Sequence, residues 1–208
     1  MPDRTIYRLC VVTDRGLARG RNLTDVIMAA VQGGATMVQL REKEAPTREF
    51  LEQARVLKAL LAPLRVPLVV NDRVDIALAV DADGVHVGQT DMPAEVVRAL
   101  VGPRKILGLS VSDEQQIFAP DVAIADYLGV GPIYAQATKG DASEPLGIQG
   151  FAALRRKTTK PVMAIGGVKP ENTRALIESG ADGVAVVSAI MSADDCALAA
   201  RSFALLFD

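Results

Sequence analysis

The sequence predicts a single (β/α)8 TIM barrel over residues 1–208, and three observations lead to this fold class. Short apolar runs alternate eight times with longer amphipathic segments, the pattern of parallel strands joined by right-handed helical crossovers. A length of 208 residues is near the lower end for one complete barrel and too short for a barrel with a second domain. Hydrophobic residues make up 50% of the chain but aromatic residues only 4%, so small branched side chains are left to fill both faces of a parallel sheet.

An open doubly wound sheet is the alternative arrangement, but eight repeats of this regularity favour closure into a barrel. Each expected strand is a short apolar run, and the runs are at residues 7–12, 37–41, 67–70, 84–88, 106–110, 127–130, 161–165 and 183–187. Each expected helix follows one of these runs, and the helices are at residues 23–31, 47–61, 74–80, 93–101, 113–118, 148–156, 171–179 and 193–206. The polar stretch 134–147 is a long loop, and such loops in compact domains are usually functional or mobile.

Capping and helix-breaking residues support these boundaries in chain order. Asn22 precedes the first helix as a preferred N-cap, and Gly33 follows it. Pro63 ends the second helix, since a proline cannot continue a helix. Pro93 suits the first turn of the fourth helix, and Gly180 ends the seventh.

Charge and cysteine content exclude several classes of function. The net charge is −2, so nothing marks the whole chain as a binder of nucleic acids or anionic membranes. Cys10 and Cys196 lack metal-binding spacing and are expected as buried or half-buried apolar residues, which fits a reducing cytoplasm. The first residues resemble neither a signal peptide nor a membrane span. The sequence leaves open whether the protein forms a homo-oligomer.

Polar residues collect where the predicted strands end. In a barrel these ends converge on one rim, where barrel enzymes place their active sites. The residues at these positions are Asp14, Arg41, Asn71, Asp72, Gln89, Ser110, Gly166, Gly167 and Ser188. Helix capping explains any single one of them, but the set as a whole indicates a site for phosphorylated ligands and a divalent metal.

The segment after the second strand carries two cations. Strand alternation places Gln39, Arg41 and Lys43 on the same side. Gln39 would point into an apolar interior, where an unpaired amide is costly, so it needs a partner or a ligand. Arg41 and Lys43 suit a phosphate or diphosphate. The alternative, evenly matched for Lys43 alone, is a solvated loop with Glu42 as counter-ion.

Two carboxylates follow neighbouring strands. Asp72 comes directly after the third strand and Asp91 shortly after the fourth, which favours a Mg2+ site shared with substrate phosphates. The alternative is helix capping, with Asp72 and Asp75 in a capping box and Asp91 ahead of Pro93.

The ends of the seventh and eighth strands suit a second phosphate. Gly167 allows close backbone approach, and Val187-Ser188 ends the eighth strand, so backbone N–H groups there can bind an anion. A plain tight turn is the alternative for the glycines. His86, the only histidine, lies in mid-strand and is interpreted as a satisfied interior residue rather than a catalytic base.

Taken together, these motifs resemble the thiamine phosphate synthase family, in order from the second strand to the eighth. The matching segments are Gln39-Leu40-Arg41-Glu42-Lys43, Asn71-Asp72-Arg73-Val74-Asp75, Gly108-Leu109-Ser110, and residues 84–92, 129–139, 164–168 and 181–188. The resemblance implies condensation of 4-amino-2-methyl-5-(diphosphomethyl)pyrimidine with thiazole phosphate to give thiamine phosphate and diphosphate.

The resemblance also implies a role for each matching residue. Those expected to hold the pyrimidine diphosphate are Gln39, Leu40, Arg41, Glu42, Lys43, Asn71, Ser110 and Lys139. Those expected to meet the thiazole phosphate are Gln136, Ala137, Thr138, Gly167, Val187 and Ser188. Asp72 and Asp91 are expected to bind the Mg2+ cofactor, and the catalytic groups implied are Arg41, Lys43, Ser110 and Lys139.

One residue departs from the family pattern, and three other functions compete. Gln136 stands where the family usually has the first threonine of Thr-x-Thr-Lys, although an amide can still donate a hydrogen bond. A sister thiazole tautomerase typically carries a histidine where this chain has Pro132. A phosphosugar isomerase would leave the diphosphate and metal motifs unexplained. A non-catalytic ligand-binding relative would be expected to have lost Asp72, Asp91 or Lys139.

Overall fold

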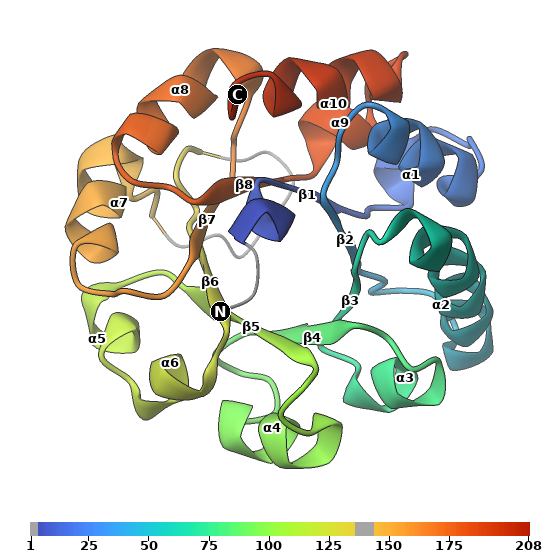
Figure 1. The fold of residues 1–208 in the computed structure, drawn as a ribbon, viewed down its shortest axis with the longest axis horizontal. Coiled ribbons are helices and arrows are strands. Elements are labelled where there is room, and N and C mark those ends of the chain that lie inside the picture. Colours follow the sequence, from blue (N-terminus) through green and yellow to red (C-terminus); the bar gives the residue numbers. More distant parts are fainter. Residues whose placement is uncertain (1–3, 136–143) are drawn as a thin grey trace.

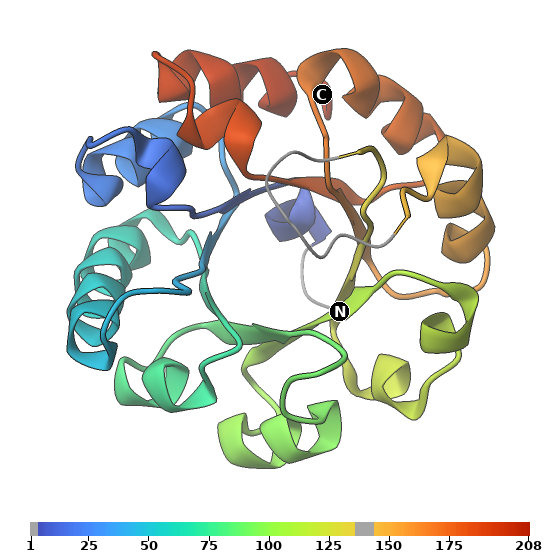
Figure 2. The same ribbon diagram turned by 180° about the vertical axis from the view of Figure 1, so that it is seen from behind.

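A computed structural model describes residues 4–135 and 144–208 and has eight parallel strands closed into a barrel. The strands follow one another around the barrel in sequence order, and β8 pairs with β1 (Figures 1 and 2). They are β1 (Leu9–Val12), β2 (Met37–Leu40), β3 (Leu68–Asn71), β4 (Gly84–Val87), β5 (Ile106–Val111), β6 (Tyr127–Val130), β7 (Val162–Ile165) and β8 (Gly183–Val186). The predicted (β/α)8 fold class is confirmed.

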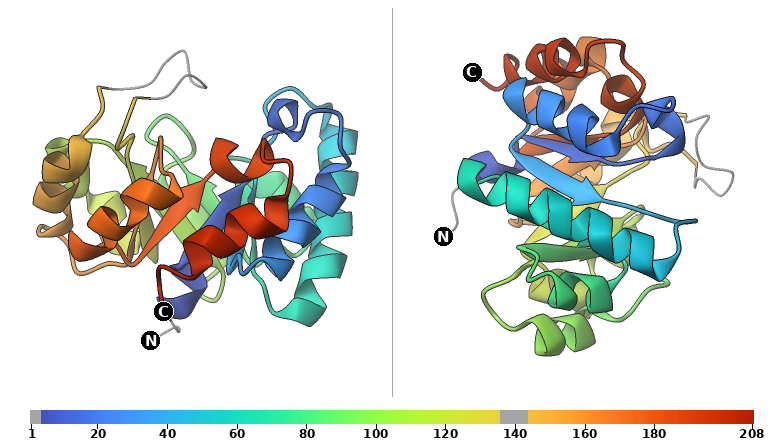
Figure 3. Two further views of the ribbon diagram at one scale, coloured as in Figure 1. Left: turned by 90° about the horizontal axis from the view of Figure 1, so that it is seen from above. Right: turned by 90° about the vertical axis from the view of Figure 1, so that its right-hand side faces the viewer.

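A ring of helices surrounds the barrel, as the side views in Figure 3 show. The α-helices are α1 (Leu23–Gln32), α2 (Thr47–Leu61), α3 (Val74–Ala79), α4 (Ala94–Val101), α5 (Glu114–Ile117), α6 (Pro120–Ile124), α7 (Gly147–Arg155), α8 (Pro170–Glu178), α9 (Ser188–Met191) and α10 (Cys196–Ala204). Three 3-10 helices are η1 (Arg4–Tyr7), η2 (Gly16–Ala18) and η3 (Ala62–Leu64). No helix in the described part of the chain is both long and apolar enough to cross a membrane.

The structure corrects three predicted boundaries. Tyr7 belongs to η1 rather than to the first strand. The fifth connection holds a second short helix, α6, which starts at Pro120 with its fixed backbone angle. The expected last helix is α10, which begins later than predicted because the side chain of Asp195 accepts the N–H of Leu198, and the short helix α9 before it was not predicted.

Side chains alternate between the inside of the barrel and the layer under the helices. Cys10, Met37 and Tyr127 belong to the interior cluster, whereas Leu9 and Val38 pack in the outer cluster between strands and helices. The interior is filled by large side chains, as expected for a barrel of eight strands. Two polar side chains, Gln39 and His86, lie buried in this interior.

Every second strand is preceded by a residue whose side chain fastens the strand before it. Asp83, Asp126 and Asp182 stand immediately before β4, β6 and β8 and accept the N–H groups of Leu68, Leu107 and Val162 at 2.8–2.9 Å. Thr36 before β2 does the same for Leu9 at 3.0 Å. The backbone N–H of each of these four residues returns a bond to the same partner's carbonyl. This ring ties the strands together in pairs at the end opposite the rim.

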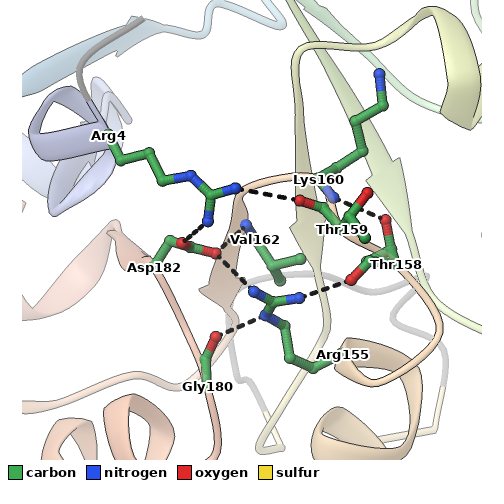
Figure 4. Close-up of polar contacts among 8 residues, drawn as sticks. All are labelled: Arg4, Arg155, Thr158, Thr159, Lys160, Val162, Gly180 and Asp182. Atoms are coloured by element: carbon green, nitrogen blue, oxygen red, sulfur yellow. Dashed lines mark hydrogen bonds and ion pairs between the residues drawn. The ribbon is translucent and has the colours of Figure 1, made fainter. Parts of the chain in front are cut away.

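Basic side chains from the helices complete the ring. Lys58 pairs with Asp83 at 2.7 Å and Arg98 with Asp126 at 2.6 Å. Figure 4 shows the third of these carboxylates, Asp182, held by Arg155 and by Arg4 of η1. Because η1 is fastened there, it lies across the end of the barrel at which the strands begin, where the C-terminus also lies (Figures 1 and 3).

Candidate active site

The two predicted metal ligands lie in contact at the carboxyl ends of β3 and β4. A hydrogen bond links the side chains of Asp72 and Asp91. The backbone N–H of Asp72 donates to the carbonyl of His86 at 2.8 Å and so extends the β3–β4 pairing, with Asp72 at a left-handed φ of 61°. An aspartate tolerates this conformation better than most residues, and a strained backbone of this kind is often found at functional sites.

Neither carboxylate caps a helix, so the capping alternative is wrong for both. Arg73 and Pro93 occupy the N-cap positions of α3 and α4 without a side-chain cap. Asp91 instead closes its own turn, with Oδ2 accepting the N–H of Gly88 at 2.7 Å. Neither carboxylate is therefore used in helix capping, and both lie at the carboxyl ends of the strands.

The charges around Asp72 locate the two predicted cations. Burial, the hydrogen bond to Asp91 and the negative charge of Asp91 raise the pKa of Asp72 to about 6, while the charges of Arg41 and Lys43 lower it. Two carboxylates in contact suit a divalent cation, whose coordination would be completed by substrate oxygens. Within residues 4–135 and 144–208 no cluster of three or more His, Cys, Asp or Glu side chains forms a complete metal site.

A chain of hydrogen bonds runs through the barrel interior to the rim. The side chain of Gln39 bonds to the hydroxyl of Tyr127, which lies 2.9 Å from His86 Nδ1. His86 Nε2 lies 2.9 Å from the hydroxyl of Ser110 at the rim. Gln39 was expected to need a partner or a ligand, and Tyr127 is that partner, while His86 is the satisfied interior residue that was expected.

Ser110 and Asn71 lie at strand ends beside this chain. Ser110 is half-buried near the end of β5, and its carbonyl accepts the side-chain N–H of Gln89 at 2.7 Å. Asn71 is the last residue of β3 and pairs in register with His86. Both residues thus lie at the rim formed by the carboxyl ends of the strands.

Besides Gln39, two residues of the segment 39–43 have buried side chains. The side chain of Leu40 packs in the outer cluster under the helices. The side chain of Glu42 is only 4% exposed and lies 3.4 Å from Arg15, and its Oε1 has no hydrogen-bond partner within residues 4–135 and 144–208. Glu42 pairs with Arg15 of the preceding loop, so the counter-ion part of the alternative is wrong, whereas Lys43 is exposed, as a solvated loop would have it.

The ends of β7 and β8 form the opposite side of the rim. Gly167 has a φ of +67°, and a Cβ there would lie 2.7 Å from the Cβ of Tyr134, so the glycine allows two loops to pack closely. Val187 precedes α9, which begins at Ser188. The first N–H groups of a helix lack partners within it. The start of α9 therefore places backbone N–H groups after β8, and their binding of a phosphate stays a prediction. The remaining predicted residues, Gln136, Ala137, Thr138 and Lys139, lie outside the described residues.

Sequence reasoning did not identify two buried residues that hold the predicted ones in place. Thr13 at the end of β1 bonds to the backbone of Arg41, and Tyr127 joins Gln39 to His86. Strand alternation could have placed Tyr127 inside the barrel. Its partners depend on the register between strands, which no local pattern gives.

Comparison with known proteins assigns the family. Residues 9–190 match the family described as thiamine monophosphate synthase. The chain belongs to this family. The thiamine-phosphate synthase of Chloroflexus aurantiacus is 52% identical over 200 residues, which cover 96% of this chain and 92% of that protein. The corresponding synthase of Syntrophomonas wolfei is 48% identical and covers 97% of both.

A solved structure of the family has the same fold. The thiamine phosphate pyrophosphorylase of Pyrococcus furiosus superposes with a TM-score of 0.89 at 38% identity, covering 98% of this chain and 96% of that one. The resemblance expected from the rim motifs is thus confirmed over nearly the whole chain.

Proposed function

We propose that this chain condenses 4-amino-2-methyl-5-(diphosphomethyl)pyrimidine with thiazole phosphate, giving thiamine phosphate and diphosphate. The observation that carries the proposal is the contact between Asp72 and Asp91, with the charges of Arg41 and Lys43 acting on the same carboxylate. A site with two carboxylates and two cations suits a diphosphate bound together with a divalent metal. The names of the relatives support the same reaction.

The metal proposed for the carboxylate pair is Mg2+, held by Asp72 and Asp91. When bound, it would supply positive charge to the leaving diphosphate. Arg41 and Lys43 hold the diphosphate and stabilise the charge that develops on its oxygens, and Lys139 joins them in the proposal. Gln39, Asn71 and Ser110 orient the pyrimidine, with Leu40 contributing through its backbone because its side chain packs under the helices.

The second substrate would bind on the other side of the rim. Gly167, Val187 and Ser188 offer backbone donors for its single phosphate. Gln136, Ala137 and Thr138 are proposed to complete this subsite. A phosphate fixed there would aim the thiazole nitrogen at the carbon that loses diphosphate. Two anion sites in one mouth favour a coupling reaction over an isomerisation.

The proposed reaction needs no histidine base. Departure of diphosphate leaves a cation that the aminopyrimidine ring can stabilise, and the thiazole nitrogen then attacks. His86, the only histidine, is bonded on both ring nitrogens inside the barrel. We place the protein in the cytoplasm, where this metabolic reaction would draw on soluble substrates.

The decisive experiment is a synthase assay with purified protein, Mg2+ and both substrates. Formation of thiamine phosphate with release of one equivalent of diphosphate is expected. Tautomerisation of the thiazole phosphate without coupling would instead identify the sister activity. The presence of Pro132, where tautomerases typically carry a histidine, favours the synthase.

A further inference from the structure

The hydrogen-bonded residues Gln39, Tyr127, His86 and Ser110 occupy a space in the barrel interior that neighbouring glycines keep open. Tyr127 is fully buried, and Gln39 and His86 are 5% and 6% exposed. Gly108 makes room for the chain, because a Cβ there would lie 2.3 Å from Tyr127 Cζ and 2.4 Å from His86 Nδ1. Gly129 faces the other edge of the imidazole, where a Cβ would lie 3.1 Å from His86 Cε1. Two glycines on neighbouring strands therefore keep open the space in which the histidine and tyrosine meet.

The hydrogen-bonding capacity of Tyr127 sets the direction of the chain. A phenol has one hydrogen to donate and accepts through its oxygen. Burial raises the pKa of Tyr127 well above its usual value, and the hydrogen bond from Gln39 lowers it, which is the effect of an N–H group donating to the phenolic oxygen. In the described part of the chain, the acceptor within reach of the phenolic hydrogen is His86 Nδ1. A buried hydroxyl hydrogen without an acceptor would be costly.

The state of the imidazole follows from this direction. If Nδ1 accepts from Tyr127, it carries no proton, and the ring proton of the neutral imidazole is on Nε2. Nε2–H then donates to Ser110 Oγ, 2.9 Å away. Because Ser110 Oγ accepts this hydrogen bond, the hydroxyl hydrogen of Ser110 can be donated to an acceptor in the mouth of the barrel.

We propose that Tyr127 and His86 are positioning residues that fix the hydroxyl of Ser110 as a hydrogen-bond donor toward the bound ligand. The identity of that ligand rests on the proposed function, in which it is the aminopyrimidine diphosphate. The geometry of the hydrogen bonds from Gln39 to Ser110 does not depend on which ligand binds. The opposite proton arrangement would present Ser110 to the ligand as an acceptor only.

The single histidine makes the proposal directly measurable. The ring 15N resonances of His86 in the untagged, ligand-free protein report its tautomer without any substrate, and the Nε2–H form is expected at neutral pH. An Nδ1–H form or a doubly protonated ring would overturn the proposal. Because this measurement is made on the wild-type protein, its result does not depend on whether a variant folds.

Two matched variants test the role of the tyrosine. Tyr127→Phe removes the donor to Nδ1 and should leave His86 as a mixture of tautomers. Tyr7→Phe is the control, because the ring of Tyr7 contacts Tyr127 in a tilted arrangement, 5.2 Å between centroids, but its hydroxyl has no partner among the described residues. The control should keep the Nε2–H form. If His86 keeps the same tautomer in Tyr127→Phe, the proposal that Tyr127 fixes this tautomer is refuted.

Kinetics then connect the chain to the ligand. Tyr127→Phe should raise the KM for the pyrimidine diphosphate by about tenfold, equivalent to one hydrogen bond, and leave the KM for the thiazole phosphate unchanged. Adding Ser110→Ala to Tyr127→Phe should cost less than Ser110→Ala alone. Equal costs would show that Ser110 acts independently of the tyrosine. If the assay shows no coupling activity but His86 is the Nε2–H tautomer, the proposed function fails and the proton arrangement stands.

Discussion

The hydroxyl of Thr13 holds the backbone of Arg41 from both sides. It accepts the N–H of Arg41 at 2.8 Å and donates to the carbonyl of the same residue at 3.0 Å. Thr13 is fully buried at the end of β1, and its own N–H bonds to the carbonyl of Gln39. The β2 end that carries the predicted diphosphate ligands is therefore fixed by a neighbouring strand.

Replacing Thr13 by valine should loosen this end of β2. Thr13→Val keeps the shape but leaves the N–H and carbonyl of Arg41 without their partner, which should cost about 1–3 kcal/mol of stability. Binding of diphosphate with Mg2+, measured by titration calorimetry, should weaken by about tenfold because Arg41 is less well placed. Thr13→Ser retains the hydroxyl and should restore binding. Normal affinity in the valine variant would show that Arg41 needs no such support.

Asp91→Asn tests the metal site without disturbing the turn. The asparagine oxygen can still accept the N–H of Gly88, but the second negative charge is lost. The apparent affinity for Mg2+, measured from the activity at graded Mg2+, should fall by at least about tenfold. Asp75→Asn is the matched control, since Asp75 is exposed and pairs with Arg73. An equal loss in both variants would count against a metal role for Asp91.

The pKa of Asp72 predicts a cost in stability for the metal-free protein. Its folded pKa of about 6 lies above its usual value of 3.8, so the folded state binds this proton more tightly than the unfolded state. The contribution of Asp72 to the free energy of unfolding is therefore most favourable at low pH and falls as the pH rises from about 4 to about 6. Because Asp72 is partly exposed, we discount the full effect of the shift to about 1 kcal/mol.

Asp72→Asn should remove this cost, and asparagine also tolerates the left-handed backbone found there. In metal-free buffer at pH 8 the variant should melt at a higher temperature than the wild type, and at pH 4 the two should converge. Mg2+ should raise the Tm of the wild type but not that of the variant. A variant less stable than the wild type at pH 8 would contradict the assignment.

Asp182→Asn should reduce stability and leave catalysis intact. Asp182 accepts from Arg4, Arg155 and the N–H of Val162 at the end of the barrel opposite the rim (Figure 4). Losing its charge should cost about 2 kcal/mol, seen in urea unfolding, with kcat and KM unchanged. Asp81→Asn, at an exposed ion pair with Lys105, should change the unfolding midpoint little. A changed kcat or KM in Asp182→Asn would show that the end of the barrel opposite the rim affects catalysis.

Much of the architecture could be predicted because it follows from local pattern. The apolar runs identified all eight strands, with most ends within a residue of those in the structure, since a buried parallel strand must be apolar on both faces. Strand ends also placed Asp72 and Asp91 at one rim, because parallel strands bring their carboxyl ends together. The short helix α9 was missed, since its four residues directly follow the eighth strand and are too few to show a helical period.

By itself the sequence determined the barrel, the family and the residue types at the rim, because periodicity and strand-end chemistry are written along the chain. Only the tertiary structure decided which of those residues meet. It buried the side chains of Leu40 and Glu42, paired Asp72 with Asp91, and joined Gln39 to Ser110 through Tyr127 and His86. These relations depend on the register between strands far apart in sequence and on closure of the barrel. Neither is encoded in any local stretch of residues.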